Sequence, residues 1–235
     1  MARRSLGSTT ELSGLRFLVS AGPTHEPIDP VRYLANRSSG KMGFAIAAEA
    51  AERGAETVLV SGPVNLDTPP GVERVDVVTA LEMYDVIHRH APSADVIVMT
   101  AAVADFRPRV RARSKIKKEL GAPTLELLPN PDILASLPAV APQALRVGFA
   151  AETDFSVEEA WAKLDRKGAD LLIWNDVATL GIGFGADHNE VTVYRHGATP
   201  LVIVRRPKRE VAKALLDLFA EVLEHREAEA LAPVG

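Results

Sequence analysis

The sequence predicts an α/β domain built on a doubly wound, mainly parallel sheet, with a C-terminal β-hairpin and helix. Apolar runs alternate with segments of helical pattern along most of the 235 residues. The runs are hydrophobic at nearly every position, as is typical of strands buried on both faces of a parallel sheet. We therefore expect one Rossmann-like, three-layer domain over residues 15–235, with the hairpin and last helix as an appendage. Residues 1–14 are polar and are expected to form a flexible tail or linker remnant.

Short apolar runs supply the expected strands. The first run ends in a Gly-Pro turn signal, and the others are bounded by turn or helix signals. Two further runs flank His196-Gly197, which predicts a hairpin. The parallel strands are expected at residues 15–21, 56–61, 95–102, 145–150 and 170–175, and the hairpin strands at residues 190–194 and 200–204.

Two helices are expected in the first half of the chain. A long loop with two prolines follows the first strand. The helix after it, over residues 40–55, has an alanine-rich body, a cap at Ser38 or Ser39 and an end at Gly54. Residues 79–89 form the second helix, because a threonine cap precedes an apolar periodic stretch.

Three more helices are expected in the second half. Residues 131–137 begin a short helix, with Asn130 as its cap and a proline at its first position. Residues 157–167 form a helix that Gly168 closes. Residues 208–225 form an amphipathic helix that ends the domain.

Composition and charge exclude several classes of protein. Apolar residues make up 47% and charged residues 25%, as in soluble globular proteins. The longest apolar run, residues 96–104, is far shorter than the roughly 20 residues that a membrane-spanning helix needs, and the start has no secretory signal. The absence of cysteine excludes disulfides and thiolate chemistry and fits a cytoplasmic protein. The net charge of −4 disfavours nucleic acid as a partner, so we expect neither nucleic-acid nor membrane binding.

Doubly wound sheets bind ligands at the carboxyl ends of their strands, and four loops there carry polar side chains. The first has the sequence NRSSGKMG and places backbone N–H groups, two hydroxyls and Lys41 at a helix start, which favours anions. It matches neither a Walker A loop nor G-x-G-x-x-G. A phosphate cradle and an ordinary capped helix with close-packed glycines explain it equally well.

The second and fourth loops offer side chains for a nucleotide. Asp105 follows the third strand, where an aspartate often accepts hydrogen bonds from ribose hydroxyls, although a turn explains it too. The fourth loop has the sequence NPDI and is followed by Phe149. Lys163 and Lys167 are four residues apart and share a helix face. Taken singly, such lysines are usually surface residues and such a phenylalanine is usually part of the core.

The third loop, residues 107–118, is strongly basic, with seven Lys or Arg and no acidic residue. A solvated run of charge and a nucleic-acid arm are both alternatives, but no aromatic residue is interleaved for base stacking. A mobile lid that closes on a polyanion fits the neighbouring loops better. The roles of its arginines stay open; they are Arg107, Arg109, Arg111 and Arg113.

No covalent nucleophile or metal motif is present. The six histidines do not form an H-E-x-x-H pattern, and there is no G-x-S-x-G elbow. Residues 187–190, DHNE, could suggest a metal, but a polar loop that enters the hairpin explains them better. The chemistry available is positioning and charge neutralisation, on which phosphoryl and nucleotidyl transfer depend.

Several motifs occur together and in a fixed order over almost the whole chain. They are SAGPTHEPIDPVRYLANRSSGKMGFAIA, TAAVADFRP, KIKK, NPDIL, VGFAAET and KGADLLIWND. In these motifs the chain resembles the bacterial phosphopantothenate–cysteine ligases (phosphopantothenoylcysteine synthetases). The resemblance extends from about Leu15 to Leu223.

The resemblance implies a ligase of coenzyme A biosynthesis that uses CTP. The carboxylate of 4′-phosphopantothenate would attack the α-phosphate of CTP, giving an acyl-cytidylate and pyrophosphate. The amine of L-cysteine would then displace CMP and form the amide of 4′-phosphopantothenoylcysteine. Mg²⁺ would accompany the nucleotide, and its protein ligands are unknown.

The family motifs also imply residue roles. Asn36 resembles the asparagine that orients the acyl intermediate, with Ala102 as a second substrate contact, and Lys115 resembles a lid lysine that stabilises charge on the nucleotide. Asp105 resembles the ribose ligand. The implied nucleotide-binding residues are Ser38, Ser39, Gly40, Lys41, Met42, Gly43, Met99, Thr100, Ala101, Asp105, Lys115, Asn130, Pro131, Asp132, Ile133, Phe149, Lys163 and Lys167.

The family is dimeric and in many bacteria is fused to a phosphopantothenoylcysteine decarboxylase, so a homodimer and such a partner domain are expected. Because the residues before Leu15 do not resemble the decarboxylase half, we expect either a stand-alone ligase or a ligase domain excised from such a fusion. Two other functions stay open. A dinucleotide-binding oxidoreductase would share the sheet but lacks its glycine fingerprint, and a nucleic-acid-binding module would use residues 107–118.

Overall fold

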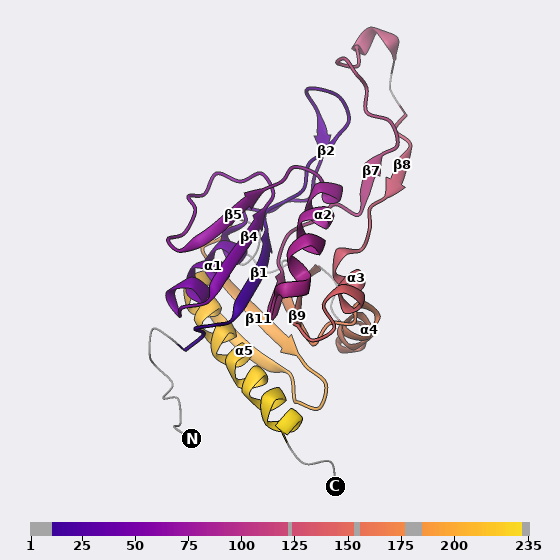
Figure 1. Cartoon of the computed structure of the whole chain (residues 1–235). Coiled ribbons are helices and arrows are strands. Elements are labelled where there is room, and N and C mark those ends of the chain that lie inside the picture. Colours follow the sequence, from indigo (N-terminus) through magenta and orange to yellow (C-terminus); the bar gives the residue numbers. More distant parts are fainter. Residues whose placement is uncertain (1–10, 122–123, 153–155, 177–184, 232–235) are drawn as a thin grey trace.

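The computed structural model describes residues 11–121, 124–152, 156–176 and 185–231 (Figure 1). Within them, the main sheet has eight strands, of which the six from the β10 side to the β5 edge run parallel. The predicted doubly wound, mainly parallel sheet is thereby confirmed. In order across the sheet the strands are β12 (Leu201–Pro207), β11 (His188–Tyr194), β10 (Leu171–Asp176), β9 (Leu145–Glu152), β6 (Val96–Met99), β1 (Arg16–Ala21), β4 (Glu56–Ser61) and β5 (Val72–Asp76).

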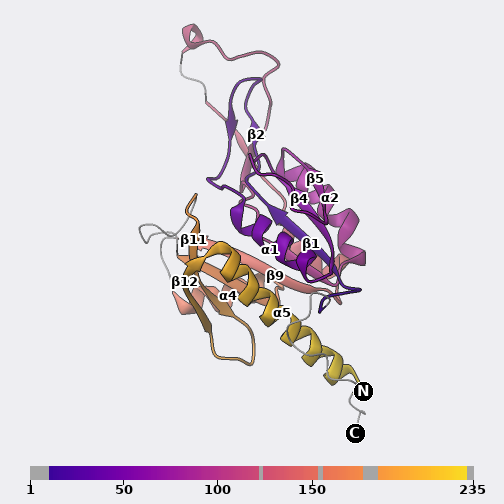
Figure 2. The same cartoon turned by 90° about the vertical axis from the view of Figure 1, so that its left-hand side faces the viewer.

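Helices cover both faces of this sheet (Figures 1 and 2). Side chains of a strand point to alternate faces. Phe17 and Val19 accordingly lie in the core cluster that includes the two helices of one face, whereas Leu18 lies in the cluster of the other face. Hydrophobic residues at consecutive positions were therefore the correct signal for a three-layer fold. The first face carries α1 (Lys41–Glu52) and α5 (Lys208–Leu231), and the second carries α2 (Ala80–His90), α3 (Ile133–Val140) and α4 (Val157–Lys167).

The C-terminal hairpin is not an appendage, contrary to the sequence prediction. β11 pairs antiparallel with β10, from Leu172 opposite Tyr194 to Asn175 opposite Val191. α5 then packs beside α1 on the sheet (Figure 2). A two-stranded hairpin is marginally stable alone, and joining the sheet satisfies the edge of β10 while it buries the apolar side of β11.

Most helix boundaries match the prediction, and two helix starts do not. α1 begins after Gly40, whose φ of 75° is left-handed, and no side chain caps it; Ser38 Oγ accepts from the N–H of Gly40 instead. α3 begins at Ile133, and its cap is Asp132. The predicted cap, Asn130, does not serve, because its side chain donates to Ala104 O at 2.8 Å. The predicted threonine cap of α2 and the closing glycine of α4 are confirmed.

The structure has short strands that the sequence did not predict. Besides β5, two small antiparallel pairs form an arm, here defined as residues 26–34, 106–121 and 124–129, which projects beyond one end of the sheet (Figure 1). Strands of two or three residues are too short for an alternating pattern to reveal. The pairs are β2 (Glu26–Pro27) with β3 (Tyr33–Leu34), and β7 (Phe106–Pro108) with β8 (Leu127–Pro129).

The packed domain begins before residue 15. Leu12 is 1% exposed, and its N–H donates to Arg53 O at 3.0 Å. Glu11 forms an ion pair with Arg53 at 3.5 Å. Thus the described end of the expected tail, residues 11–14, belongs to the domain. A buried leucine in a polar stretch gives no periodic signal, which is why the sequence missed it.

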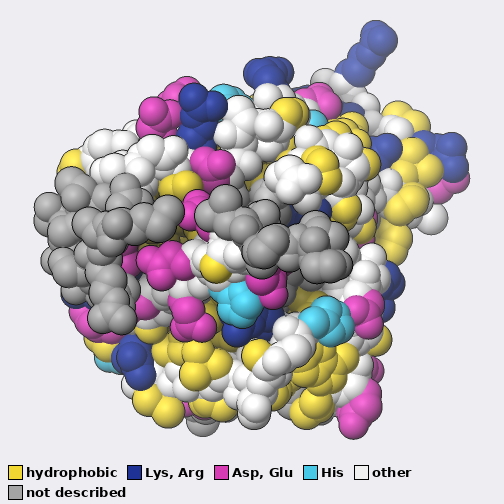
Figure 3. Space-filling model, turned by 60° about the horizontal axis from the view of Figure 1, so that its bottom comes forward, with side chains coloured by type: hydrophobic (Ala, Val, Ile, Leu, Met, Phe, Trp, Pro, Cys, Tyr) yellow, Lys and Arg dark blue, Asp and Glu magenta, His cyan; other side chains and the backbone are white. Residues whose placement is uncertain are grey.

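No helix in the described ranges is long and apolar enough to cross a membrane. On the face at the bottom of Figure 1, acidic, basic and hydrophobic side chains are intermixed (Figure 3). The described residues visible on this face therefore form no patch of a single charge sign of the kind that attracts nucleic acid.

Candidate functional site

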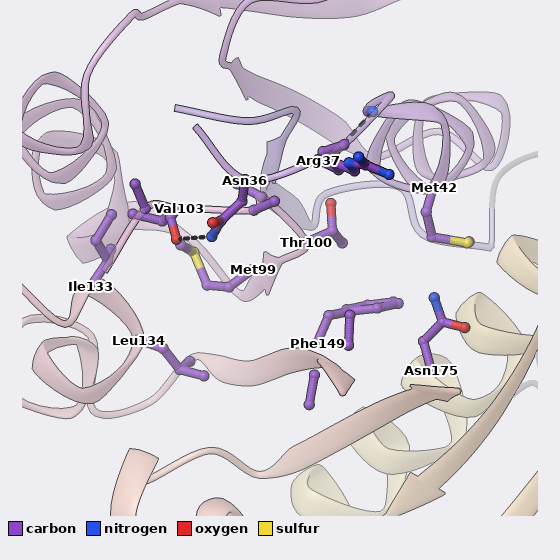
Figure 4. Close-up of a pocket in the computed structure, with 18 of the residues that line it drawn as sticks. Asn36, Arg37, Met42, Met99, Thr100, Val103, Ile133, Leu134, Phe149 and Asn175 are labelled. Carbon is purple, nitrogen blue, oxygen red and sulfur yellow. Dashed lines mark hydrogen bonds between the residues drawn. The ribbon is translucent and has the colours of Figure 1, made fainter. Parts of the chain in front are cut away.

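A cavity of about 710 Å³ opens at the carboxyl ends of β6 and β9, beside the starts of α1 and α3 (Figure 4). This is where a doubly wound sheet is expected to bind a ligand. The residues predicted for the site come together here, with Lys115 as the exception. The lining includes Asn36, Ser38, Ser39, Gly40, Lys41, Met42, Gly43, Met99, Thr100, Ala101, Ala102, Asp105, Asn130, Pro131, Asp132, Ile133, Phe149, Lys163 and Lys167.

Asn36 joins two of the predicted loops. Its Nδ2 donates to the carbonyl of Val103 at 2.9 Å (Figure 4). The bond connects the segment before α1 with the segment after β6, and it orients the amide at the mouth of the cavity. A fixed amide of this kind can hold a carbonyl or phosphoryl group in one orientation.

The first turn of α1 is pressed against the ends of β1 and β6. A Cβ atom on Gly43 would lie 2.4 Å from Thr100 Oγ1 and 2.6 Å from Ala21 Cβ, so no side chain fits there. Thr100 Oγ1 is itself fixed, because it donates to Ser20 O at 2.5 Å. The glycine thereby brings the N-terminal N–H groups of α1 to the cavity floor, where they favour an anion.

Apolar side chains from α3 and β9 also line the cavity. Leu134 and Phe149 are both part of this lining (Figure 4), and they pack against core clusters on opposite faces of the sheet. Gly148 makes room for Leu134, because a Cβ there would lie 2.5 Å from Leu134 Cδ2. Asp132 accepts from the N–H of Ala135 at 3.1 Å and pairs through its other oxygen with Lys167. An apolar lining beside fixed polar groups suits the base of a nucleotide.

Positive charge collects at the start of α1. Lys41 Nζ contacts Asp187 Oδ1 at 2.6 Å and Gly185 O at 3.2 Å, and this hydrogen bond holds the pKa of Asp187 below its usual range. Lys208 also lines the cavity, and burial together with the charge of Lys41 lowers the pKa of its ammonium group. Sequence analysis missed Lys208. It stands at the start of a predicted helix, but nothing local links it to a loop more than 160 positions away.

Other lining residues were also missed, and some had a signal. Asn175 ends a predicted strand at the ligand-binding edge, so its position alone could have marked it. Asn189 lies in the DHNE segment, which was interpreted as a polar loop that enters the hairpin, with a metal site as the less favoured alternative. The described residues contain no group of three or more His, Cys, Asp or Glu that could hold a metal ion. The remaining lining residues are Arg37, Val103, Ala104, Leu134, Ala150, Ala151 and Leu172.

Lys115 lies on the arm and is exposed, outside the described lining of the cavity. The neighbouring backbone is clamped. Ile116 N–H donates to Asp29 Oδ2 at 3.2 Å, and Arg32 Nη2 donates to Ile116 O at 2.9 Å. Asp29 is 2% exposed, and the guanidinium of Arg32 holds its pKa well below the usual range. Ten residues after Asp105, the chain has followed the arm away from the cavity, so the predicted proximity of Lys115 does not occur within this chain.

Two arginines of the basic run have structural partners. Arg107 Nη1 donates to Pro129 O at 2.6 Å and to Asn130 Oδ1 at 3.0 Å. Arg109 pairs with Glu126 at 2.8 Å across the arm. These contacts hold β7 and β8 together. The positive charge of residues 107–118 is therefore partly neutralised, and these residues are not simply a solvated stretch of like charge.

Comparison with known proteins shows the family of almost the whole chain. The family described as "DNA/pantothenate metabolism flavoprotein C-terminal domain" matches residues 12–223. This chain belongs to that family. Coenzyme A biosynthesis bifunctional protein CoaBC of Vibrio cholerae is 45% identical over 214 residues, which are 89% of this chain and 53% of that protein. The Escherichia coli K12 protein of the same name is 43% identical over 221 residues, covering 92% and 54%.

A solved structure shows the same fold over the same extent. The crystal structure of the C-terminal domain of a CoaBC protein is 39% identical, with a TM-score of 0.79, and the match covers 92% of this chain and 99% of that one. The chain spans about half the length of the curated relatives it matches. Its similarity is thus to the C-terminal domain of the bifunctional proteins.

Proposed function

We propose that this domain is a CTP-dependent phosphopantothenate–cysteine ligase of coenzyme A biosynthesis. The observation that carries the proposal is the cavity, which gathers the residues of several separate sequence motifs at one end of the sheet. The family membership and the names of its relatives, coenzyme A biosynthesis proteins, support the pathway.

The reaction needs two bond exchanges and no nucleophile from the protein. In the first, a carboxylate oxygen of 4′-phosphopantothenate attacks the α-phosphorus of CTP, and the bond to pyrophosphate breaks. In the second, the amine of L-cysteine attacks the acyl carbon, loses a proton, and releases CMP. The substrates supply both nucleophiles, so the protein's tasks are to position three reactants and to offset their negative charge.

The cavity offers a place for each task. The apolar lining from α3 and β9 would contact the cytosine ring, while Asp105 would accept from the ribose. The start of α1 would bind phosphates through its N–H groups and Lys41. Asn36 would orient the acyl-cytidylate, because its amide is already held at the mouth by Val103.

Mg²⁺ fits this cavity as a companion of the nucleotide. Asp132 is engaged by Lys167, and the described residues contain no carboxylate cluster for a dedicated metal site. Magnesium commonly keeps several waters and takes its other ligands from substrate phosphates. It would supply charge neutralisation at the triphosphate, with the two amide side chains of Asn175 and Asn189 near enough to line the same cavity.

The arm is the surface to which a second copy of the chain would bind in a homodimer. Apolar side chains are exposed along it, including Phe106 at 53% and Val110 at 73%. A homodimer that covers the arm would also bring Lys115 toward a cavity, which its own chain does not. We further expect a phosphopantothenoylcysteine decarboxylase to act on the product, as a fused or separate partner.

A pyrophosphate-release assay tests this function. CTP and 4′-phosphopantothenate should release pyrophosphate in a single turnover, and L-cysteine should make the release catalytic. Omission of either of the first two should abolish the signal. Equal pyrophosphate release with CTP alone would contradict the proposal. So would tight NADH binding with no release, which would favour a dinucleotide-binding oxidoreductase.

A further inference from the structure

A second lysine faces the end of the cavity where α1 begins. Lys208 is the first residue of α5 and is only 8% exposed. Lysines are seldom this buried without compensation. Its Nζ donates to the backbone carbonyl of Ala186, while the nearby carboxylate of Asp187 is bound by Lys41. Among the residues that the structure describes, Lys41, Lys208 and Asp187 bring two positive charges and one negative charge to this corner, and this balance favours an anionic ligand.

The protein's own chain covers the two lysines. Residues 185–187 supply a carbonyl and a carboxylate to Lys41 and a carbonyl to Lys208. The backbone N–H of Lys208 also donates to Asp187 O at 2.9 Å. Asp187 itself is 81% exposed at its side chain, so water competes for it and the pair is weak. A ligand with several negative oxygens could replace these acceptors at little cost.

Two amides beside the lysines have buried oxygens without a donor. Asn189 is 1% exposed, and its Oδ1 has no hydrogen-bond partner within the part of the chain that the structure describes. The same holds for Oδ1 of Asn175, and both residues line the cavity. A buried acceptor left without a donor is costly. The corner therefore suits a ligand that brings negative oxygens for the lysines and O–H donors for the amides.

We propose that Lys208 and Lys41 together bind the terminal phosphates of the nucleotide, which would take the place of residues 185–187 as acceptors for the two ammonium groups. The inference rests on the proposed function and assigns a direction to the nucleotide. Its base would lie between α3 and β9, and its polyphosphate would end between the starts of α1 and α5. Waters of an accompanying magnesium ion would supply donors to Asn175 and Asn189.

Direct binding measurements distinguish a contact of Lys208 with the terminal phosphates from a general effect of Lys208 on nucleotide binding. Isothermal titration with pyrophosphate and Mg²⁺, and separately with CMP, would be made on the full chain. Lys208→Gln should bind pyrophosphate roughly 10- to 100-fold more weakly, the typical effect of losing a hydrogen bond to a charged group, and should bind CMP as the parent does. Lys208→Arg should recover most of the affinity. Lys213→Gln is the matched control and should change neither affinity, because Lys213 lies on the same helix but outside the described lining of the cavity, and its ammonium group pairs with Glu210.

Asp187→Asn should change the affinity for pyrophosphate in the opposite direction from Lys208→Gln. It removes the competing carboxylate, so pyrophosphate should bind severalfold more tightly. If the ion pair were only structural, this variant would bind more weakly. Equal pyrophosphate affinity of the parent and Lys208→Gln would overturn the inference and leave the proposed function standing. A parent that binds neither CTP nor pyrophosphate would overturn both, whereas a parallel loss of CMP affinity in Lys208→Gln would overturn the assignment to the terminal phosphates.

Discussion

Gly43 is the residue whose replacement best tests the geometry of the cavity floor, because two effects act on it with opposite signs. Within a helix, glycine is about 1 kcal/mol less favourable than alanine, so Gly43→Ala should be stabilising if only propensity acts. The added Cβ would, however, lie 2.4 Å from Thr100 Oγ1, 2.6 Å from Ala21 Cβ and 3.0 Å from Ser20 O. Two of these contacts are far below van der Waals distance.

The clash cannot be relieved by a side-chain movement. Ser20 O is backbone, Ala21 has no rotamer, and Thr100 is fixed by its hydrogen bond to Ser20 O. α1 must move instead, and overpacking of this kind typically costs about 1–3 kcal/mol. We therefore expect Gly43→Ala to lower the free energy of unfolding by up to about 2 kcal/mol after the propensity gain is subtracted. We also expect weaker CTP binding, because the N-terminal N–H groups of α1 are displaced.

Urea unfolding and CTP titration measure the two effects. Gly148→Ala is the matched control, because its Cβ would meet the flexible end of Leu134 at 2.5 Å and no rigid atom closer than 3.5 Å. It should cost less stability than Gly43→Ala, because Leu134 can change its side-chain conformation to make room. Stabilisation of the protein by Gly43→Ala, with unchanged CTP affinity, would refute the close approach of α1 to the sheet.

Three further predictions concern the half-reactions and the arm. Asn36→Asp puts a carboxylate beside an anionic intermediate, so amide formation should fail while cytidylate formation partly survives; mass spectrometry should then detect accumulated acyl-cytidylate, and turnover like that of the parent would contradict the role. Lys115→Gln should slow cytidylate formation by roughly 10²–10³-fold, and Lys118→Gln should slow it less. If both variants lost the same activity and added salt had the same effect, the basic residues would act only through their summed charge, and Lys115 would have no specific role. The pKa of Asp29 is lowered in the folded protein, so its contribution to stability is fully present at neutral pH and is lost progressively as the pH falls from about 3.8 toward the lowered pKa. At pH 7, Asp29→Asn should therefore speed hydrogen exchange at the Ile116 N–H, and unchanged exchange would show that Asp29 does not clamp the arm.

The parallel sheet was predictable because its central strands are buried on both sides. Val96 and Ile97, for instance, face opposite core clusters, so both positions are apolar. β5 lies at the sheet edge, and its exposed Glu73 and Asp76 break the run. A continuous apolar pattern thus reveals the central strands and misses β5, whereas the edge strand β12 was found through its hairpin signal.

The cavity was predictable where motif residues directly follow strands. Asp105 and Asn130 lie far apart in sequence, yet each stands in a loop at the ligand-binding edge, and the N–H of Asn130 donates to Asp105 O at 2.8 Å. Lys208 and Lys115 show the limit. The first reaches the cavity only because α5 folds back beside α1, and the second leaves it because the arm leads outward. Sequence spacing determines proximity within one helix or strand but not across such long-range packing.

The fate of the carboxylate oxygens of 4′-phosphopantothenate tests most directly whether this cavity activates the acid through the α-phosphate. The measurement uses substrate with ¹⁸O in both carboxylate oxygens, together with CTP and L-cysteine, and mass spectrometry of the products. Attack on the α-phosphorus followed by aminolysis predicts one ¹⁸O atom in the phosphate of CMP and one in the amide carbonyl. Label in pyrophosphate, or CMP without label while the amide forms, would contradict activation as an acyl-cytidylate.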